Sequence, residues 1–350
     1  MIIRILIDGA VFVLIGSATL LCLPEVVEEE IFRYEVVEIP LKSESVLAEP
    51  ITLLFVGDVM LGRKVEWYMD TQGLSYPFKN IVPFLQKPDR TIGNFEGIVS
   101  EEHIPTPQMT FQFSIKKEYL TYLHAIGFDV LSLANNHSLD YGTSSLFFTR
   151  ELCASSGLIC VGTPKGIDSF SSRIIDVKGT KIGFLSLETI NGQPRDEGIR
   201  SELTQLASSS DIQIVLVHWG TEYVLSHSRE QQQLAHKLIE YGADAIIGHH
   251  PHVIQDIEIY KEKPIFYSLG NFIFDQYFST DVQEELGVLM SVTASTTTYT
   301  LIPFSSTTTQ SQPNFMTQTQ KQTLFLRVLQ RSVQNPAVHI ESGTILVPKN

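Results

Sequence analysis

From residue 51 onward, short apolar runs alternate with stretches of helical spacing, and this alternation constrains the fold more than any other feature of the chain. Seven runs have the length of strands and end beside glycine or a polar residue, at 51–56, 90–93, 129–134, 181–187, 212–218, 244–248 and 264–270. The segments 116–127 and 228–242 have helical apolar spacing and end in glycine, which favours a helix C-terminus. Strands that alternate with helices predict a largely parallel sheet, with ligands at the carboxyl ends of its strands.

Two other segments predict antiparallel pairs. Residues 173–187 indicate a hairpin around Lys178 and Gly179, and residues 287–304 indicate a second hairpin through a turn rich in serine and threonine. Such pairs allow a second sheet to pack on the first, with helices outside. We expect the polar stretch 305–322 to be exposed and residues 323–333 to form a short helix.

The charge and the cysteine content exclude several classes of partner. The formal net charge of −14 at pH 7 disfavours nucleic acid and anionic lipid as bulk partners. An anionic substrate remains compatible with this charge where metal ions supply positive charge locally. Three cysteines are too few for a disulfide framework. Cys153 and Cys160 either pair, in an extracytoplasmic domain, or remain as two buried thiols.

The first 24 residues have the pattern of a signal peptide or a membrane anchor. Residues 2–23 are almost wholly apolar, and their length lies between a signal-peptide core and a full membrane helix. An uncleaved anchor, a cleaved signal and a buried core helix all fit this pattern. Because Arg4 precedes the uncharged stretch 9–23 and acidic residues follow it, we expect the main domain outside the cytoplasm, in a single-pass protein of the cell membrane or a secreted one. The acidic residues 25–49 indicate a linker.

Carboxylate and amide side chains follow the first two predicted strands. Asp58 comes directly after the first strand, where a carboxylate is suited to bridge two cations. A turn or helix-capping aspartate is the simpler alternative. Asn94 and Glu96 follow the next run and lie on the same side of an extended segment. Alone, this second pair indicates little more than a turn.

Amides and imidazoles follow two later strands. Asn135, Asn136 and His137 come directly after the run 129–134. An asparagine oxygen can ligate a metal ion, and an adjacent histidine can protonate a leaving group. An asparagine-rich turn with a solvated histidine is the alternative. His218, which ends its own run, is either a metal ligand or a core histidine bonded to a backbone carbonyl.

Three of the ten histidines lie within four residues, at His249, His250 and His252. Pro251 biases His250 towards an extended backbone, which helps His250 and His252 to converge on one site. A chance surface cluster is the alternative, and the position directly after a predicted strand argues against it. Asn271 either supports such a site or is an ordinary turn asparagine.

These donors are carboxylate, amide and imidazole groups, without cysteine. Such a set suits Mn²⁺, Fe or Zn²⁺ in a binuclear site, and Mg²⁺ less well because imidazole favours softer ions. Two divalent ions would lower the pKa of a bridging water and clamp a phosphoryl or acyl group.

Six motifs occur in order between about residues 52 and 276, and they read FVGDVMLGR, GNFEG, LSLANNHSLDYG, VHWGTEY, GHHPHVIQ and YSLGNFIFDQ. Together they resemble the CapA family of poly-γ-glutamate capsule biosynthesis proteins, in the calcineurin-like metallophosphatase superfamily. The resemblance implies an α/β fold, a four-layer α-β-β-α sandwich of the metallophosphatase type over residues 50–304. Residues 305–350 would add a polar loop and a C-terminal extension to the same domain. The site would then lie between the carboxyl ends of two sheets.

Carried over residue by residue, the resemblance implies a metal site made of Asp58, Glu96, Asn136, His218, His250 and His252. It also implies residues that contact substrate or support the ligands, namely Asn94, Asn135, His249 and Asn271. Asp58 as the bridging carboxylate and His137 at the leaving group would act in catalysis. One position departs from the pattern, since Met60 stands where phosphatases of the superfamily usually carry a histidine. One metal would therefore be held tightly and the other weakly.

The resemblance implies a metal-dependent hydrolase that serves synthesis, export or attachment of a poly-γ-glutamate polymer. It would be tethered to the membrane through residues 2–23. Its partners would be an anionic polymer or phosphoester substrate and membrane-bound subunits of polymer synthesis. A non-enzymatic assembly subunit and a plain metallophosphodiesterase are the alternatives.

Overall fold

The computed structural model describes the residues 3–7, 10–14, 49–107, 110–332, 338–339 and 343–348. They belong to two compact units, Met1–Leu47 and Ala48–Asn350. In the first unit, β1 (Ile3–Ile7) and β2 (Ala10–Leu14) form an antiparallel pair. Most of the predicted apolar helix and nearly all of the predicted linker lie outside the described residues. Within the described part of the chain, no helix is both long and apolar enough to cross a membrane.

The second unit holds two β-sheets, of which the smaller has six strands. These strands are β7 (Ser172–Val177), β8 (Thr180–Glu188), β9 (Ile212–His218), β10 (Ala245–His249), β11 (Ile257–Tyr260) and β12 (Lys263–Phe266). Their order is β11-β12-β10-β9-β8-β7. The four inner strands are parallel, and β7 and β11 are antiparallel edge strands. The predicted hairpin at 173–187 is confirmed as β7 and β8.

The larger sheet combines a parallel half with an antiparallel half. Its strands are β3 (Ile51–Val59), β4 (Arg90–Phe95), β5 (Val130–Ser132), β6 (Ile159–Val161), β13 (Asn271–Ile273), β14 (Glu284–Val292), β15 (Thr296–Ser305), β16 (Asn314–Phe315), β17 (Val338–His339) and β18 (Thr344–Pro348). The order is β17-β18-β15-β14-β3-β4-β5-β6, with β13 on β3 and β16 on β15. The strands β3 to β6 are parallel. The predicted hairpin at 287–304 is confirmed as β14 and β15.

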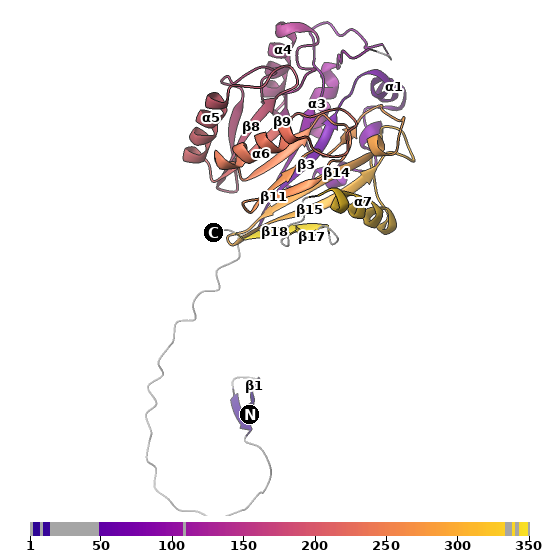
Figure 1. Ribbon diagram of the computed structural model, residues 1–350. Helices are drawn as coiled ribbons and strands as arrows, with labels where there is room; N and C mark the ends of the chain where they lie inside the picture. The colour runs from indigo at the N-terminus through magenta and orange to yellow at the C-terminus, as the bar shows by residue number, and fades with distance from the viewer. Residues whose placement is uncertain are drawn as a thin grey trace, which may run out of the picture. The chain divides into compact units, whose positions relative to one another are not determined.

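Helices cover the outer faces of both sheets (Figure 1). They are α1 (Arg63–Gln72), α2 (Val82–Leu85), α3 (Lys117–Ala125), α4 (Gly142–Ser155), α5 (Asp196–Ser209) and α6 (Arg229–Glu240), with short 3₁₀ turns at Tyr76–Phe78 and Asp281–Gln283. The last helix, α7 (Gln318–Arg331), packs instead against the cluster between the sheets. One apolar cluster joins α1 to α4 with the larger sheet, and another joins α5 and α6 with the smaller sheet. A third cluster fills the space between the sheets and includes side chains of α7. The second unit therefore has mixed α/β architecture with its two sheets packed face to face.

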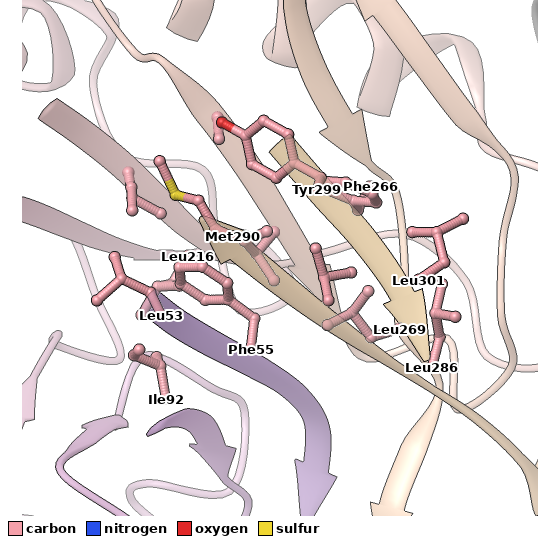
Figure 2. Packing of buried hydrophobic residues seen from close by; sticks show 14 of the residues in the cluster. Leu53, Phe55, Ile92, Leu216, Phe266, Leu269, Leu286, Met290, Tyr299 and Leu301 are labelled. Carbon is pink, nitrogen blue, oxygen red and sulfur yellow. The ribbon is translucent and has the colours of Figure 1, made fainter. Parts of the chain in front are cut away.

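Alternation along the central strands explains these layers. In β3, Leu53 and Phe55 pack between the sheets, while Leu54 and Val56 pack towards the helices. Figure 2 shows Leu53 and Phe55 beside Leu216 of the smaller sheet. Because both faces of β3 are buried, its sequence is a continuous apolar run rather than an alternating one.

The chain passes from one sheet to the other just before the last predicted motif. The expectation of a single strand over 264–270 is wrong, because β12 ends at Phe266 and β13 pairs with β3 in the other sheet. Gly270 has φ +73°, and its carbonyl accepts the Asp58 N–H at 3.0 Å. A Cβ on Gly57 would lie 2.0 Å from the same carbonyl oxygen, so the crossing requires glycine there. This crossing brings Asn271 beside Asp58.

The C-terminal part differs in one respect from the sequence-based expectation. The stretch 305–322 is not uniformly exposed, since its buried residues include Ser306, Ser311 and Gln312. Burial is tolerated because partners exist, as when the Ser311 hydroxyl donates to the Phe274 carbonyl at 2.8 Å. The predicted helix at 323–333 is α7, which begins earlier because Thr317 starts a capping box.

Candidate metal centre

Two strands of the larger sheet carry one half of the site. Asp58 on β3 and Asn94 on β4 are register partners, and Glu96 follows β4 directly. All three side chains are fully buried. The Asn94 amide donates to Asp58 Oδ1 at 2.8 Å and to Glu96 Oε2 at 3.3 Å. One amide therefore holds two carboxylates close together in the protein interior.

Two strands of the smaller sheet carry the other half. His218 ends β9, and His250 and His252 follow β10. His250 Nδ1 lies 3.1 Å from His218 Nε2. His252 reaches the larger sheet, with Nδ1 3.3 Å from Asp58 Oδ2 and Nε2 3.5 Å from Glu96 Oε1. The imidazoles of one sheet thus meet the carboxylates of the other.

The backbone around Pro251 is not extended as predicted. His250 has φ +96° and His252 has φ +58°, a region that residues other than glycine rarely adopt. Such conformations cost about 1–3 kcal/mol each and persist where surrounding contacts fix them. Here the His250 N–H donates to Asp58 Oδ2 at 3.4 Å, and the Pro251 carbonyl accepts the Tyr223 N–H at 2.8 Å. The histidines converge through a left-handed turn rather than through an extended segment.

The residues in this cluster fit a divalent cation. Asp58, Glu96 and His218 offer ligand atoms that all lie within 4.8 Å of one another. Glu96 Oε1 is buried and accepts no hydrogen bond within the described part of the chain. His252 Nε2, 3.5 Å away, is only a partial partner, because a buried carboxylate oxygen without a hydrogen bond remains costly and is suited to a cation. Asn136 adds an amide oxygen, which lies 2.8 Å from His218 Nε2.

The pKa values of the two carboxylates are shifted in opposite directions. Burial acts to raise the pKa of Asp58, but the hydrogen bond from His252 and the charges of His249 and His252 outweigh it, so the pKa lies below its ordinary value. Burial raises the pKa of Glu96 well above its ordinary value, because the charges that oppose burial are weaker there. A bound cation would favour the ionised form of both groups.

The pKa values of the histidines are also shifted in different directions. Burial lowers the pKa of His218 well below its ordinary value and lowers that of His250 to about 4. Burial also acts to lower the pKa of His252, but the charges of Glu96 and Asp58 raise it to about 9. His218 and His250 are therefore neutral at pH 7, and neutral imidazole is the form that ligates metals.

His137 lies at the edge of the cluster and is held by a residue that the sequence interpretation missed. Its Nδ1 lies 2.8 Å from Asp140 Oδ2, and its ring stacks on Phe113 with centroids 4.0 Å apart. Its Nε2 lies 3.0 Å from the Asn136 amide and 3.8 Å from Glu96 Oε1. The signal for Asp140 was its spacing, three residues after His137, within the motif already singled out.

Three further predicted residues lie around the cluster. Asn135 donates to the Asn94 amide oxygen at 3.2 Å, and the Asn271 oxygen lies 3.0 Å from His252 Nδ1. The His249 ring instead lies 3.2 Å from the Val56 carbonyl, as in a satisfied core histidine. The structure therefore brings all the predicted residues together, although His249 contacts the backbone rather than the two carboxylates.

The departure at Met60 has a local explanation. The side chain is fully buried, and its sulfur accepts the Gly62 N–H at 3.0 Å within the turn after β3. A thioether in this position stabilises the turn and is a weak acceptor, so it does not replace an imidazole ligand.

Residues 52–276, which contain all these positions, match the family described as bacterial capsule synthesis protein PGA_cap. The chain belongs to this family. It is 32% identical over 249 residues to the capsule biosynthesis protein CapA of Bacillus anthracis, covering 65% of this chain and 61% of the relative. It is 34% identical over 238 residues to the PGA biosynthesis protein CapA of Bacillus subtilis strain 168, covering 63% of each. The match thus spans less than two thirds of these relatives.

Among solved structures, the chain is similar to that of a phosphatase from Mycoplasma pneumoniae. It is 16% identical, covers 70% of this chain and 88% of its own, and has a TM-score of 0.44. The resemblance to the CapA family that the six motifs indicated is confirmed by the family match and by the two CapA relatives.

Proposed function

We propose that this protein is a metal-dependent hydrolase that acts in the synthesis, export or attachment of a poly-γ-glutamate capsule polymer. The observation that carries the proposal is the buried cluster of Asp58, Glu96 and His218, to which Asn136 and His250 add donors. The polymer is suggested by family membership and by the printed names of the CapA relatives.

The donor set supports a divalent metal, with Mn²⁺, Fe or Zn²⁺ favoured over Mg²⁺ because imidazoles contribute. Asp58, Glu96, Asn136, His218 and His250 would supply ligands, and His252 would join them by releasing its proton as the metal binds. The same six residues would hold two ions in a binuclear site. Bound there, a divalent metal supplies Lewis acidity to a phosphoryl or acyl group.

Side chains of the protein would donate the proton, position the carboxylates and exclude water. His137 is the candidate general acid, because Asp140 holds its Nδ1 and leaves its Nε2 facing the cluster. Asn94 would hold the two carboxylates close together through the amide that donates to both. The carboxylates and imidazoles are buried, so little bulk water would reach them. Exclusion of water would strengthen their electrostatic interactions with a bound substrate.

A disulfide supports a location outside the cytoplasm. Cys153 of α4 and Cys160 of β6 are joined in the structure. Disulfides persist in oxidising compartments and are rare in the cytosol. We therefore propose that the main domain is extracytoplasmic, attached through residues 2–23 or secreted, and that it works beside membrane-bound polymer synthesis subunits.

Metal content and hydrolysis test the proposal together. Purified full-length wild type should contain at least about one divalent ion per chain by elemental analysis. It should hydrolyse bis(p-nitrophenyl) phosphate or a γ-linked glutamate oligomer, and His250→Ala should lose both the metal and the activity. A wild type that is metal-free and inactive after incubation with Mn²⁺ and Zn²⁺ would contradict the proposal.

Met60 favours a second candidate function, a metal-stabilised assembly subunit without turnover. Its sulfur is committed to Gly62, so one ligand of a full phosphatase set is missing. Unfolding measured with and without EDTA, beside the hydrolysis assays, separates the two candidates. Stabilisation by metal without hydrolysis of either substrate would favour the assembly subunit.

A further inference from the structure

A cavity of about 650 Å³ lies beside the metal centre and uses none of the predicted ligands. Its walls come from distant parts of the chain, namely Arg63 and Lys64 at the start of α1, Phe111, Tyr223 and the segment 275–278. This volume is typical of small-molecule sites and would hold a few units of an extended chain.

Two contacts connect the cavity to the cluster. Tyr223 lines the cavity, and its ring centroid lies 6.0 Å from that of His252. The Arg63 guanidinium carbon lies 4.7 Å from the centroid of Phe113, and the same ring stacks on His137. Arg63 in the cavity wall and His137, the candidate general acid, therefore contact one aromatic ring.

The cavity has one cation that no carboxylate neutralises. Asp275 accepts hydrogen bonds from the Arg63 guanidinium and from the Lys64 N–H, so the Arg63 charge is compensated. The Lys64 ammonium lies 4.0 Å from the Trp67 ring centroid and forms no ion pair with any carboxylate in the described residues. In a chain with a net charge of −14, an uncompensated lysine in a cavity favours an anionic ligand.

Aromatic side chains form the open side of the cavity. Tyr223, Phe278 and Phe111 are 40%, 65% and 76% exposed, and because all three line one cavity they form an exposed apolar patch of the kind that marks a binding groove. The rings of Tyr223 and Phe278 meet edge to face, with centroids 5.0 Å apart. Such a wall offers apolar surface to methylene groups at little entropic cost.

We propose that this cavity is a subsite that binds an oxyanion carried on a flexible apolar chain, adjacent to the bond that the metal centre would cleave. Lys64 binds the oxyanion, and Tyr223 and Phe278 pack on the chain. A polymer carboxylate and a phosphate group share this chemistry. The place of the subsite in catalysis rests on the proposed hydrolase function, whereas binding to it does not require turnover.

Calorimetric titration of the full-length protein tests the subsite. The probes are γ-linked tetraglutamate, the same peptide with its carboxylates converted to carboxamides, and tripolyphosphate. Lys64→Gln should weaken tetraglutamate binding about tenfold, between the values for an exposed ion pair and a buried charged hydrogen bond. Lys64→Arg should bind nearly as wild type does. Lys117→Gln, the same charge change on the exposed start of α3, is the matched control and should also bind as wild type does.

The outcomes separate the subsite from the proposed function. Dependence on Lys64 that appears with tripolyphosphate instead of tetraglutamate would support the subsite and identify phosphate as its oxyanion. The subsite is overturned if wild type binds neither anion, or if Lys64→Gln binds both as tightly as wild type does. It is also overturned if Lys64→Gln weakens binding of the carboxamide peptide by the same factor as binding of tetraglutamate. Binding that depends on Lys64 in a protein without hydrolytic activity would keep the subsite and remove the hydrolase.

Discussion

At the residue scale, the orientation of His137 depends on a single carboxylate. Asp140 Oδ2 contacts His137 Nδ1 and also accepts the Phe113 N–H at 2.7 Å. It therefore fixes both the imidazole and the ring that stacks on it. Because Nδ1 is held in this way, Nε2 is the nitrogen that faces Glu96. Asp140 acts through His137 and is a positioning residue.

We predict that Asp140→Asn lowers kcat about 10- to 100-fold, the usual cost of losing a group that orients a catalytic or ligating histidine, with little change in KM. Kinetics on bis(p-nitrophenyl) phosphate measure the effect, and Asp176→Asn in the β7–β8 hairpin is the control. Metal content should stay at the wild-type value. Loss of metal together with activity would show that Asp140 supports the fold of the site instead.

A second residue-scale prediction concerns Glu285, a buried carboxyl on β14 outside the candidate site. Burial raises its pKa well above the ordinary value, and one of its oxygens has no hydrogen-bond partner in the described chain. The folded protein therefore keeps a proton that the unfolded chain releases once the pH rises above about 4.5, so the free energy of unfolding falls as pH rises through that range.

We predict that Glu285→Gln raises the free energy of unfolding at pH 8 by about 1–3 kcal/mol, the cost of an unsatisfied buried polar group. The gain should shrink towards pH 4, where the wild-type carboxyl is protonated in both states. Urea unfolding across this pH range measures it, and Glu151→Gln on the exposed face of α4 is the control. An equal gain at both pH values would contradict the assigned cause.

At the element scale, apolar runs predicted most central strands, because strands such as β3 and β9 are buried on both faces. The ligands were predictable for the same reason, since Asp58 and His218 lie where those runs end. The split after Phe266 was not predictable, because it depends on the contact between Gly57 and Gly270 from opposite ends of the domain. The cavity at Lys64 was missed because its walls meet only in the folded chain.

The disulfide between α4 and β6 gives a prediction at this scale. Cys153 and Cys160 are seven residues apart, and a loop of that size stabilises by about 2–3 kcal/mol through the entropy of the unfolded chain. Replacing both by alanine should lower the free energy of urea unfolding by that amount. Dithiothreitol should lower the stability of wild type and leave the double variant unchanged. A wild type that is insensitive to the reductant would argue against the bond.

At the scale of the whole molecule, the candidate site exists only when the two sheets are docked. Asp58 and Glu96 belong to the larger sheet, and His218, His250 and His252 belong to the smaller one or follow it. The contact between His252 and the two carboxylates crosses the gap directly. A cation bound there would be bound by the folded state alone, so metal binding and sheet docking must be linked.

This linkage predicts how metal affects stability. Mn²⁺ at about a hundredfold over its dissociation constant should raise the free energy of unfolding of wild type by about 2.7 kcal/mol, and EDTA should reverse the effect. His250→Gln removes a donor at the junction of the sheets and should reduce the gain, whereas His124→Gln on α3 should keep it. Because His250 is neutral over most of the physiological range, the gain should persist from pH 6 to 8. Equal free energies of unfolding for the metal-loaded and metal-free proteins would contradict the linkage and show that the two sheets dock without an ion.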